Sequence, residues 1–170
     1  MDVSEIRDLD YQTLYRWRLL FLSFPAVGAA GLPVSEDLDI RCETTQLPTA
    51  ENQKIEIGLK NHTVYQHGKL TYNNSIDMTW LETTDNRIKA FLKALRELTH
   101  QTRTGQSVTK QDLEATVQIQ LLNQEDDPVW QYTMFGMFFM TNDPGQLGNE
   151  SDIQRITGTL SYDFFDDGPV

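Results

Sequence analysis

Large apolar residues alternate with other residues along several segments of the chain, which predicts a mainly β protein. From position 15 to position 21, every second residue is apolar and large: Tyr15, Trp17, Leu19 and Phe21. Side chains two positions apart lie on the same face of a strand, so this segment is predicted to be a strand with one buried face. The same alternation recurs in five later segments: residues 54–60, 75–80, 116–121, 130–134 and 155–164.

Three other segments extend this prediction. Between positions 135 and 140 every residue except Gly136 is apolar, which is typical of a strand covered on both faces and indicates the middle of the core. The acidic residues around Asp37 lead into a further predicted strand that carries Ile40 and Cys42. Residues 166–169, with two aspartates, a glycine and a proline, are expected to form a short solvated tail.

One segment has the period of a helix, over residues 84–100. Its apolar residues recur at three- and four-residue spacing, which places them on one stripe that is expected to pack on the sheet as a lid. They are Ile88, Phe91, Leu92, Leu95 and Leu98. Thr83 or Thr84 is predicted to cap the free N–H groups at its start, with Asp85 in the first turn.

The segment from Gln46 to Asn74 is predicted to be a long hairpin that projects from the body. It contains two strand-like pieces joined by polar turns, is rich in exposed charge and has little core of its own. No linker is long enough to divide the chain, so residues 1–170 are expected to form a single domain.

The overall charge of the chain argues against tight binding of nucleic acid. The formal charge is −11 and the pI is near 4.6, whereas proteins that hold phosphates present clustered Lys and Arg. The single Cys42 excludes an internal disulfide and is interpreted as a buried thiol. The sequence begins with acidic residues and has no apolar run of membrane-spanning length, so neither a signal peptide nor a membrane anchor is expected, and the chain is interpreted as a soluble cytoplasmic product.

Few residues are arranged for chemistry. The histidines His62, His67 and His100 match no metal-binding spacing, and the acidic residues 125–127 and 166–167 are interpreted as solvated loop charge. The sequence has no glycine-rich phosphate loop and no nucleophile elbow. We therefore expect no catalytic residue, no metal and no cofactor.

Aromatic residues raise the alternative of a surface on which sugars or bases stack. Most of them occupy the inward positions of alternating strands or the doubly apolar segment, so the interpretation as core side chains is favoured. The set is Trp17, Trp80, Trp130, Tyr132, Phe135, Phe138 and Phe139.

Short motifs along the chain resemble, in their order, those of the tail tube proteins of contractile-tailed phages. They are Tyr15-Arg16-Trp17, Ile40-Arg41-Cys42-Glu43 with Leu47-Pro48, Glu82-Thr83-Thr84-Asp85, Trp130-x-Tyr132 and Tyr162-Asp163. The resemblance implies an antiparallel β-sandwich or half-barrel with one flanking α-helix and a long protruding hairpin, related to the tube subunit of type VI secretion.

The resemblance also implies an assembly. Six copies would form a ring whose strands join around a DNA channel, and the rings would stack into a tube for genome delivery in a virion assembled in the host cytoplasm. The expected partners are further copies of the chain, the tail sheath, and baseplate or terminator proteins. DNA would only pass through the lumen.

Within this resemblance, two sets of residues have expected roles. Ring stacking or other subunit contacts are assigned to the hairpin region: Leu47, Pro48, Lys54, Glu56, Lys60, His62, Tyr65 and His67. Polar members of the alternating strands are possible lumen residues: Asp77, Thr79, Gln118, Gln120, Thr157 and Thr159.

Other functions remain open from the sequence. The chain could be a tube initiator, a tube terminator or a secretion-tube subunit. A monomeric β-sandwich binding module that uses exposed aromatics such as Tyr65 and Tyr72 is the competing class.

Overall fold

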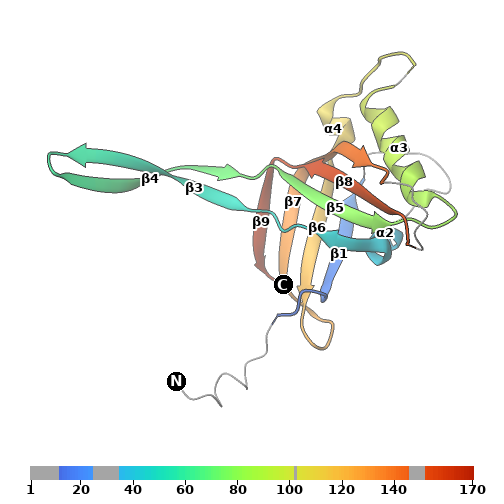
Figure 1. The fold of residues 1–170 in the computed structure, drawn as a ribbon, viewed down its shortest axis with the longest axis horizontal. Helices are drawn as coiled ribbons and strands as arrows, with labels where there is room; N and C mark the ends of the chain where they lie inside the picture. Colours follow the sequence, from blue (N-terminus) through green and yellow to red (C-terminus); the bar gives the residue numbers. More distant parts are fainter. Residues whose placement is uncertain (1–11, 25–34, 102, 146–151) are drawn as a thin grey trace.

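Antiparallel strands form the body of the molecule, from which a long hairpin protrudes (Figure 1). The computed structural model describes residues 12–24, 35–101, 103–145 and 152–170. Six strands pair in the order β1 (Trp17–Ser23), β6 (Ala115–Leu122), β7 (Pro128–Asp143), β8 (Arg155–Ser161), β5 (Ser75–Leu81) and β2 (Cys42–Thr45). A seventh, β9 (Phe164–Pro169), pairs with β7 outside this order.

Strand β7 belongs to two layers because it changes neighbours along its length. Its first part pairs with β6 and β9, and its second part pairs with β8. Between them lies Gly136, whose φ of 66° is unfavourable for residues with a side chain. A Cβ atom at Gly136 would also clash with a carboxylate oxygen of Asp163. Glycine at this position therefore allows the sheet to continue from one layer to the other as an open half-barrel.

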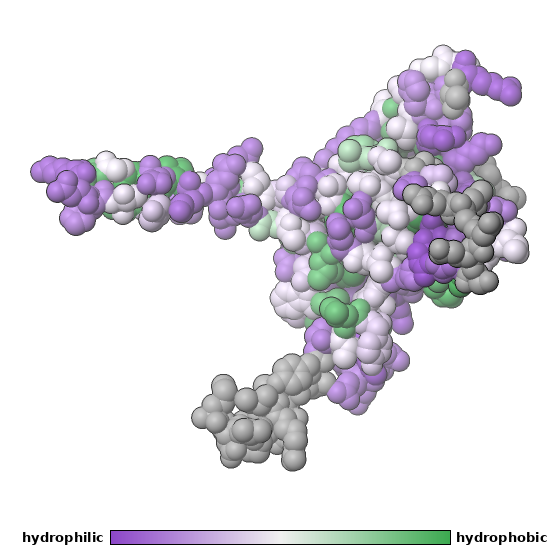
Figure 2. Space-filling view, viewed as in Figure 1, coloured by the Kyte–Doolittle hydropathy of each residue, from purple (hydrophilic) through white to green (hydrophobic). Residues whose placement is uncertain are grey.

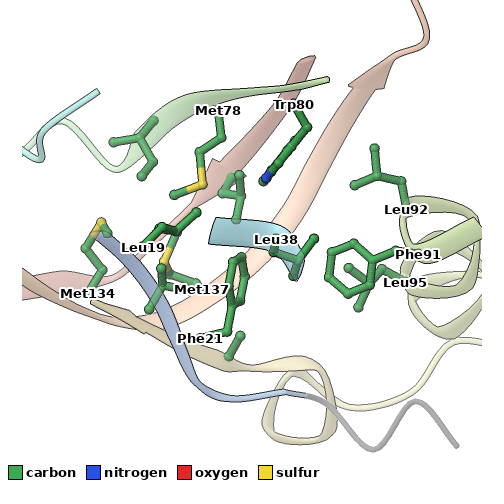
Figure 3. Close-up of a cluster of buried hydrophobic side chains, with 14 of the residues drawn as sticks. Leu19, Phe21, Leu38, Met78, Trp80, Phe91, Leu92, Leu95, Met134 and Met137 are labelled. Atoms are coloured by element: carbon green, nitrogen blue, oxygen red, sulfur yellow. The ribbon is translucent and has the colours of Figure 1, made fainter. Parts of the chain in front are cut away.

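The core lies between the two layers and is made of the side chains that strand alternation predicts. The first layer contributes the fully buried Leu19, Val117, Ile119 and Met134, and the second contributes Ile76, Met78, Trp80, Ile156 and Leu160. Figure 3 shows Met78 and Trp80 facing Leu19, Met134 and Met137 across this core. The mainly β fold predicted from the sequence is confirmed.

The predicted helix is present as α3 (Arg87–Thr99), with its apolar stripe on the core. The prediction of its start was wrong. Asn86 is the N-cap and makes no side-chain cap, and Asp85 precedes the first turn. The buried carboxylate of Glu82 instead accepts hydrogen bonds from the N–H groups of Ile88 and Lys89, at 3.4 and 2.9 Å. Because Glu82 satisfies these free N–H groups, Thr83 and Thr84 are not needed as caps. A short α4 (Lys110–Leu113) follows.

The prediction of a strand through Ile40 was also wrong, because Ser35–Arg41 form helix α2 and strand β2 begins only at Cys42. Leu38 is completely buried in this helix, and Figure 3 shows it lying between the two layers. Ile40 is 82% exposed. Helix α2 therefore packs on the core through Leu38, whereas the sequence had suggested a strand with Ile40 and Cys42 on its buried face.

The C-terminal residues are not a solvated tail, since Phe164–Pro169 form strand β9 on the edge of β7. Phe165 is the anchor, with its ring 5.5 Å from that of Tyr72 and 6.3 Å from that of Tyr132. Two further details differ from the sequence expectation. Tyr15 precedes β1 and is largely exposed, and Met140, in the segment expected to be covered on both faces, is exposed as well.

The protruding hairpin, called the arm below, consists of β3 (Ala50–Leu59) and β4 (His62–Tyr72), as predicted. These two strands pair with each other and form a sheet of their own. At about 3.3 Å per residue, the ten residues of β3 span roughly 30 Å. Figure 1 shows that most of this length extends beyond the body.

Candidate assembly surfaces

The arm has two chemically different faces. Its strand register places Ile57 opposite Val64 and Leu59 opposite His62, on the same face as Ile55. We call Ile55, Ile57, Leu59 and Val64 the apolar arm face. Three of these side chains are between 47% and 58% exposed, and Figure 2 shows green apolar atoms among purple ones toward the end of the arm. The part of the subunit that the structure describes leaves this face exposed.

The opposite face carries four of the eight residues expected to stack rings. It holds Lys54, Glu56, Tyr65 and His67, and the ammonium group of Lys54 lies 4.1 Å from the centre of the Tyr65 ring. Lys60 and His62 lie at the turn of the arm. At the base of the arm, Leu47 is 41% exposed, whereas Pro48 is buried. Pro48 therefore anchors the arm within the subunit.

The arm differs from the body in charge. Residues 46–74 contain three of the 14 Lys and Arg residues of the chain and two of its 25 Asp and Glu residues. The arm therefore has a formal charge of +1, and the remainder of the chain has a charge of −12. The net charge of the whole chain conceals this asymmetry, which a count by segment would have found.

The possible lumen residues form two separate rows, one on the outer face of each layer. Thr159 donates a hydrogen bond to Asp77 at 2.7 Å, and the hydroxyls of Thr79 and Thr157 lie 3.1 Å apart. On the other layer, Gln118 donates to Gln131 and to Thr133, and Gln120 donates to Gln118. Because the outer faces of two packed layers point away from their common core, the two rows lie on opposite sides of the subunit.

Two of the motifs that carry the family resemblance contact each other. Arg41 donates a hydrogen bond to Thr83 and lies 3.6 Å from a carboxylate oxygen of Asp85. Arg87 then pairs with both Asp85 and Asp37, at 2.8 and 2.9 Å. The hydrogen bond from Thr83 and the two nearby arginines hold the pKa of Asp85 below its ordinary value. These residues fix α2 against the segment that leads into α3.

Helix α2 also shields one edge of the sheet. The backbone N–H of Leu19 donates to the carboxylate of Asp39 at 2.5 Å, and the N–H of Phe21 donates to the hydroxyl of Ser35 at 2.8 Å. Both N–H groups lie on the edge of β1 that faces away from β6. Burial raises the pKa of Asp39. Unpaired edge groups invite pairing with another chain, and α2 satisfies two of them.

A groove of about 360 Å³ lies beside α2, where the start of β1 approaches the start of β2. It is lined by Leu14, Tyr15, Trp17, Asp39, Cys42 and Glu43, and we call it the α2 groove. Leu14 and Tyr15 are 97% and 74% exposed. Burial raises the pKa of the Cys42 thiol to about 12, so this thiol stays protonated at neutral pH. Cys42 is half-buried, less than the sequence suggested.

Acidic and basic side chains both lie around the rim of the α2 groove. Arg155 makes a two-pronged contact with Glu43, at 2.7 and 3.1 Å, and also pairs with Asp152 at 2.9 Å. One cation is thus shared between two carboxylates. Asp39 adds a third acidic residue, whereas Arg18 lies near Asp39 and the guanidinium of Arg16 lies 5.6 Å from the centre of the Tyr15 ring.

Clusters of side chains suited to metal binding are not found among the described residues. In the described ranges, no three His, Cys, Asp or Glu side chains are gathered to hold a metal ion. Trp80 is fully buried, and Trp17, Tyr132 and Phe139 pack against the core, as the interpretation of the aromatics as core residues requires. The helices within the described part are too short or too polar to cross a bilayer.

Comparison with known proteins relates this chain to others through fold alone. Neither protein-family models nor curated protein sequences match it. Among solved structures, a chain from the sheath/tube terminator of an extracellular contractile injection system, PVC, matches with a TM-score of 0.65 and 11% identity, covering 95% of this chain and 99% of that one. A chain from the tube terminating cap of the anti-feeding prophage matches with a TM-score of 0.62, 13% identity and full coverage of both chains.

A chain from the sheath-tube complex of the PVC system is also similar. Its TM-score is 0.59 at 12% identity, with 100% of this chain and 99% of that chain covered. Sequence identities this low establish a shared fold and nothing finer. The protein therefore has the fold found in tube, cap and terminator assemblies of contractile injection systems, which confirms the resemblance suggested by its sequence motifs at the level of fold.

Proposed function

We propose that this protein is a structural subunit of a phage tail tube, in which six copies form a ring and stacked rings surround a channel for genome delivery. The observation that carries the proposal is the arm. A sheet of two strands with an exposed apolar face is at best marginally stable alone in water, and exposed apolar patches mark interaction sites. Contact with another subunit would bury the apolar arm face and order the arm.

The fold supports the same proposal. Chains of similar fold occur in sheath-tube, terminator, cap and baseplate structures of contractile injection systems. The proposed partners are accordingly further copies of this chain, a tail sheath, and baseplate or terminator proteins. The protein would be assembled in the host cytoplasm and reside in the tail of the virion, without a catalytic role.

The row on the layer of β5 and β8 is the better candidate for the channel wall. It contains hydroxyl groups and the carboxylate of Asp77, and Arg155, on the same strand as Thr157 and Thr159, is held by Glu43 and Asp152. The glutamine row lies beside Arg18, which is paired in register with Gln120. DNA moves most freely past a wall that does not bind phosphate. The β5–β8 row therefore suits a channel better.

Sedimentation velocity and electron microscopy of the purified protein test the assembly. We expect stacked rings, or rings that stack as the protein concentration rises. A species that stays monomeric at high concentration, with or without baseplate proteins to nucleate growth, would instead support the binding module.

Matched charge substitutions in phage particles test the channel wall. Asp77→Lys places a cation in the β5–β8 row and is expected to slow DNA ejection, whereas Gln118→Lys places one in the glutamine row and is expected to leave ejection unchanged. Unchanged ejection and assembly with Asp77→Lys would remove this row from the channel. An effect of Gln118→Lys alone would assign the channel to the other layer.

A tube-end role is the second candidate, because similar chains occur in a terminator and in a cap structure. Counting copies per particle distinguishes the two roles. The number of repeating subunits rises with tube length, whereas the number of end subunits is constant.

A further inference from the structure

Two apolar surfaces of this chain face solvent, one on the arm, whose formal charge is +1, and one on the remainder of the chain, whose charge is −12. The α2 groove presents Leu14, Tyr15 and Trp17 beside the acidic residues Asp39 and Glu43. On the arm, Lys54 lies on the face opposite the apolar arm face, and Lys60 lies at the turn. Apolar area on each side and charges of opposite sign are the features of complementary interfaces.

We propose that the arm of one copy docks in the α2 groove of another copy. The apolar arm face would lie on Leu14, Tyr15 and Trp17, and Lys60 at the turn of the arm would lie near Asp39 and Glu43. This inference rests on the proposed tube function and adds to it the surface that receives the arm. The occupant comes from another copy, because Figure 1 shows the arm extending away from β1 and α2, which form the groove.

Charge selects the arm over other parts of a second copy. A body of charge −12 repels a second body of the same charge, so copies approach most favourably where one of them presents its cationic segment. The arm is that segment. Such a contact is heterologous, since the arm and the groove are different surfaces, and heterologous contacts generate rings or extended stacks.

The geometry of the groove favours a preformed receptor. Arg155 ties Glu43 on β2 to Asp152, and Asp39 is held by the backbone of Leu19. The rim therefore changes little on docking, and the ordering cost falls mainly on the arm.

Cysteine cross-linking tests this contact. In a Cys42→Ser background, Tyr15→Cys is combined either with Val64→Cys on the apolar arm face or with Thr63→Cys, the preceding residue on the opposite face. After treatment with a short bis-maleimide, we expect a ladder of cross-linked copies on denaturing gels, several-fold stronger for Val64→Cys than for Thr63→Cys. Tyr15, Thr63 and Val64 are all exposed in the subunit, so each variant is expected to fold.

Microscopy of the same samples separates the possible failures. Tubes with equal or absent cross-linking for the two pairs would overturn the docking while leaving the tube function intact. Absence of any assembly would overturn the tube function and the docking with it. A cross-link confined to monomers would show that the arm reaches its own groove, which also overturns the docking.

The remaining competitor for the groove is the segment that precedes it in the chain, residues 1–11. If this segment fills the groove, the thiol introduced by Tyr15→Cys reacts slowly with maleimide in the monomer and rapidly once residues 1–11 are deleted. Rapid reaction in both proteins is expected if the groove is open for an arm, and slow reaction relieved by the deletion would overturn the proposal.

Discussion

The body and the arm of this protein are stabilised in different ways. In the body, side chains from both layers and from α2 and α3 fill one core, in which Leu19, Leu38 and Trp80 are completely buried. In the arm, the two strands form a sheet separate from that of the body, and Ile55, Leu59 and Val64 are exposed. The difference predicts that the body folds as a single subunit, whereas the apolar face of the arm would be buried only against another surface.

Removing the arm is the strongest test of this difference, because assembly should be lost while the stability of the body is kept. The N–H of Asn73 donates to the carbonyl of Thr49 at 3.0 Å, so the two ends of the arm already lie together. Replacing residues 52–70 by a two-residue Asn-Gly turn, which keeps Tyr72 against Phe165, is expected to abolish tubes while leaving the thermal midpoint of the body nearly unchanged. Electron microscopy and calorimetry measure the two effects. Loss of the folded body would show that the arm is part of the core.

A cavity in the core of the body should instead lower the free energy of unfolding. Trp80→Ala removes a fully buried side chain, for which a loss of about 3–5 kcal/mol of unfolding free energy is typical. Tyr65→Ala on the arm is the matched control, and its effect on stability is expected to stay within about 0.5 kcal/mol, as for exposed residues in general. Urea unfolding of the two variants gives the comparison. Equal losses would contradict a separate core and arm.

Substitutions of glycine by alanine compare how much the backbone of the body and that of the arm depend on glycine. Gly136→Ala forces a side chain into the left-handed region and against Asp163, so we expect a loss of about 1–3 kcal/mol. Gly58→Ala, in the arm, meets no atom within 4 Å and has no positive φ, so its effect is expected to be small. Unfolding midpoints test both. A neutral Gly136→Ala would mean that the change of layer along β7 does not need glycine.

The sequence predicts the body better than it predicts the connections between its parts. Alternation reveals strands and their inward residues because one face of each strand contacts the core. Helix α2 is short and has the single buried residue Leu38, so it leaves no helical period, and Ile40 and Cys42 imitate a strand. Strand β9 was missed because its pairing with β7 uses backbone groups, which its sequence of aspartate, glycine and proline does not reveal.

The candidate surfaces, too, could be predicted only in part from the sequence. The period of Ile55, Ile57 and Leu59 is visible in the sequence, but only the structure shows that nothing in the described part of the subunit covers this face. The α2 groove joins residues 14–17 to residues 39–43, and the contact of Arg41 with Thr83 and Asp85 joins two motifs about 40 positions apart in the chain. Contacts between segments so far apart depend on tertiary structure, and no local sequence pattern predicts them.

The smallest expected effect concerns Asp39, which lies where the body borders the α2 groove. Burial raises the pKa of its carboxyl above the ordinary value of 3.8, despite the hydrogen bond from Leu19 and the nearby Arg18. An acid with a raised pKa in the folded state contributes stability at low pH, and this contribution is lost as the pH rises through the raised pKa.

Replacement of this acid by an amide isolates the effect of its ionisation. The amide introduced by Asp39→Asn keeps an acceptor for the N–H of Leu19 but does not ionise. The variant is therefore expected to gain stability relative to the native protein as the pH rises above 3.8, and to keep a constant difference beyond the raised pKa. Urea unfolding of both proteins at a series of pH values measures this difference. If the stability difference between the two proteins does not change with pH, the carboxyl of Asp39 has the same pKa in the folded body as in the unfolded chain, and its burial does not disfavour ionisation.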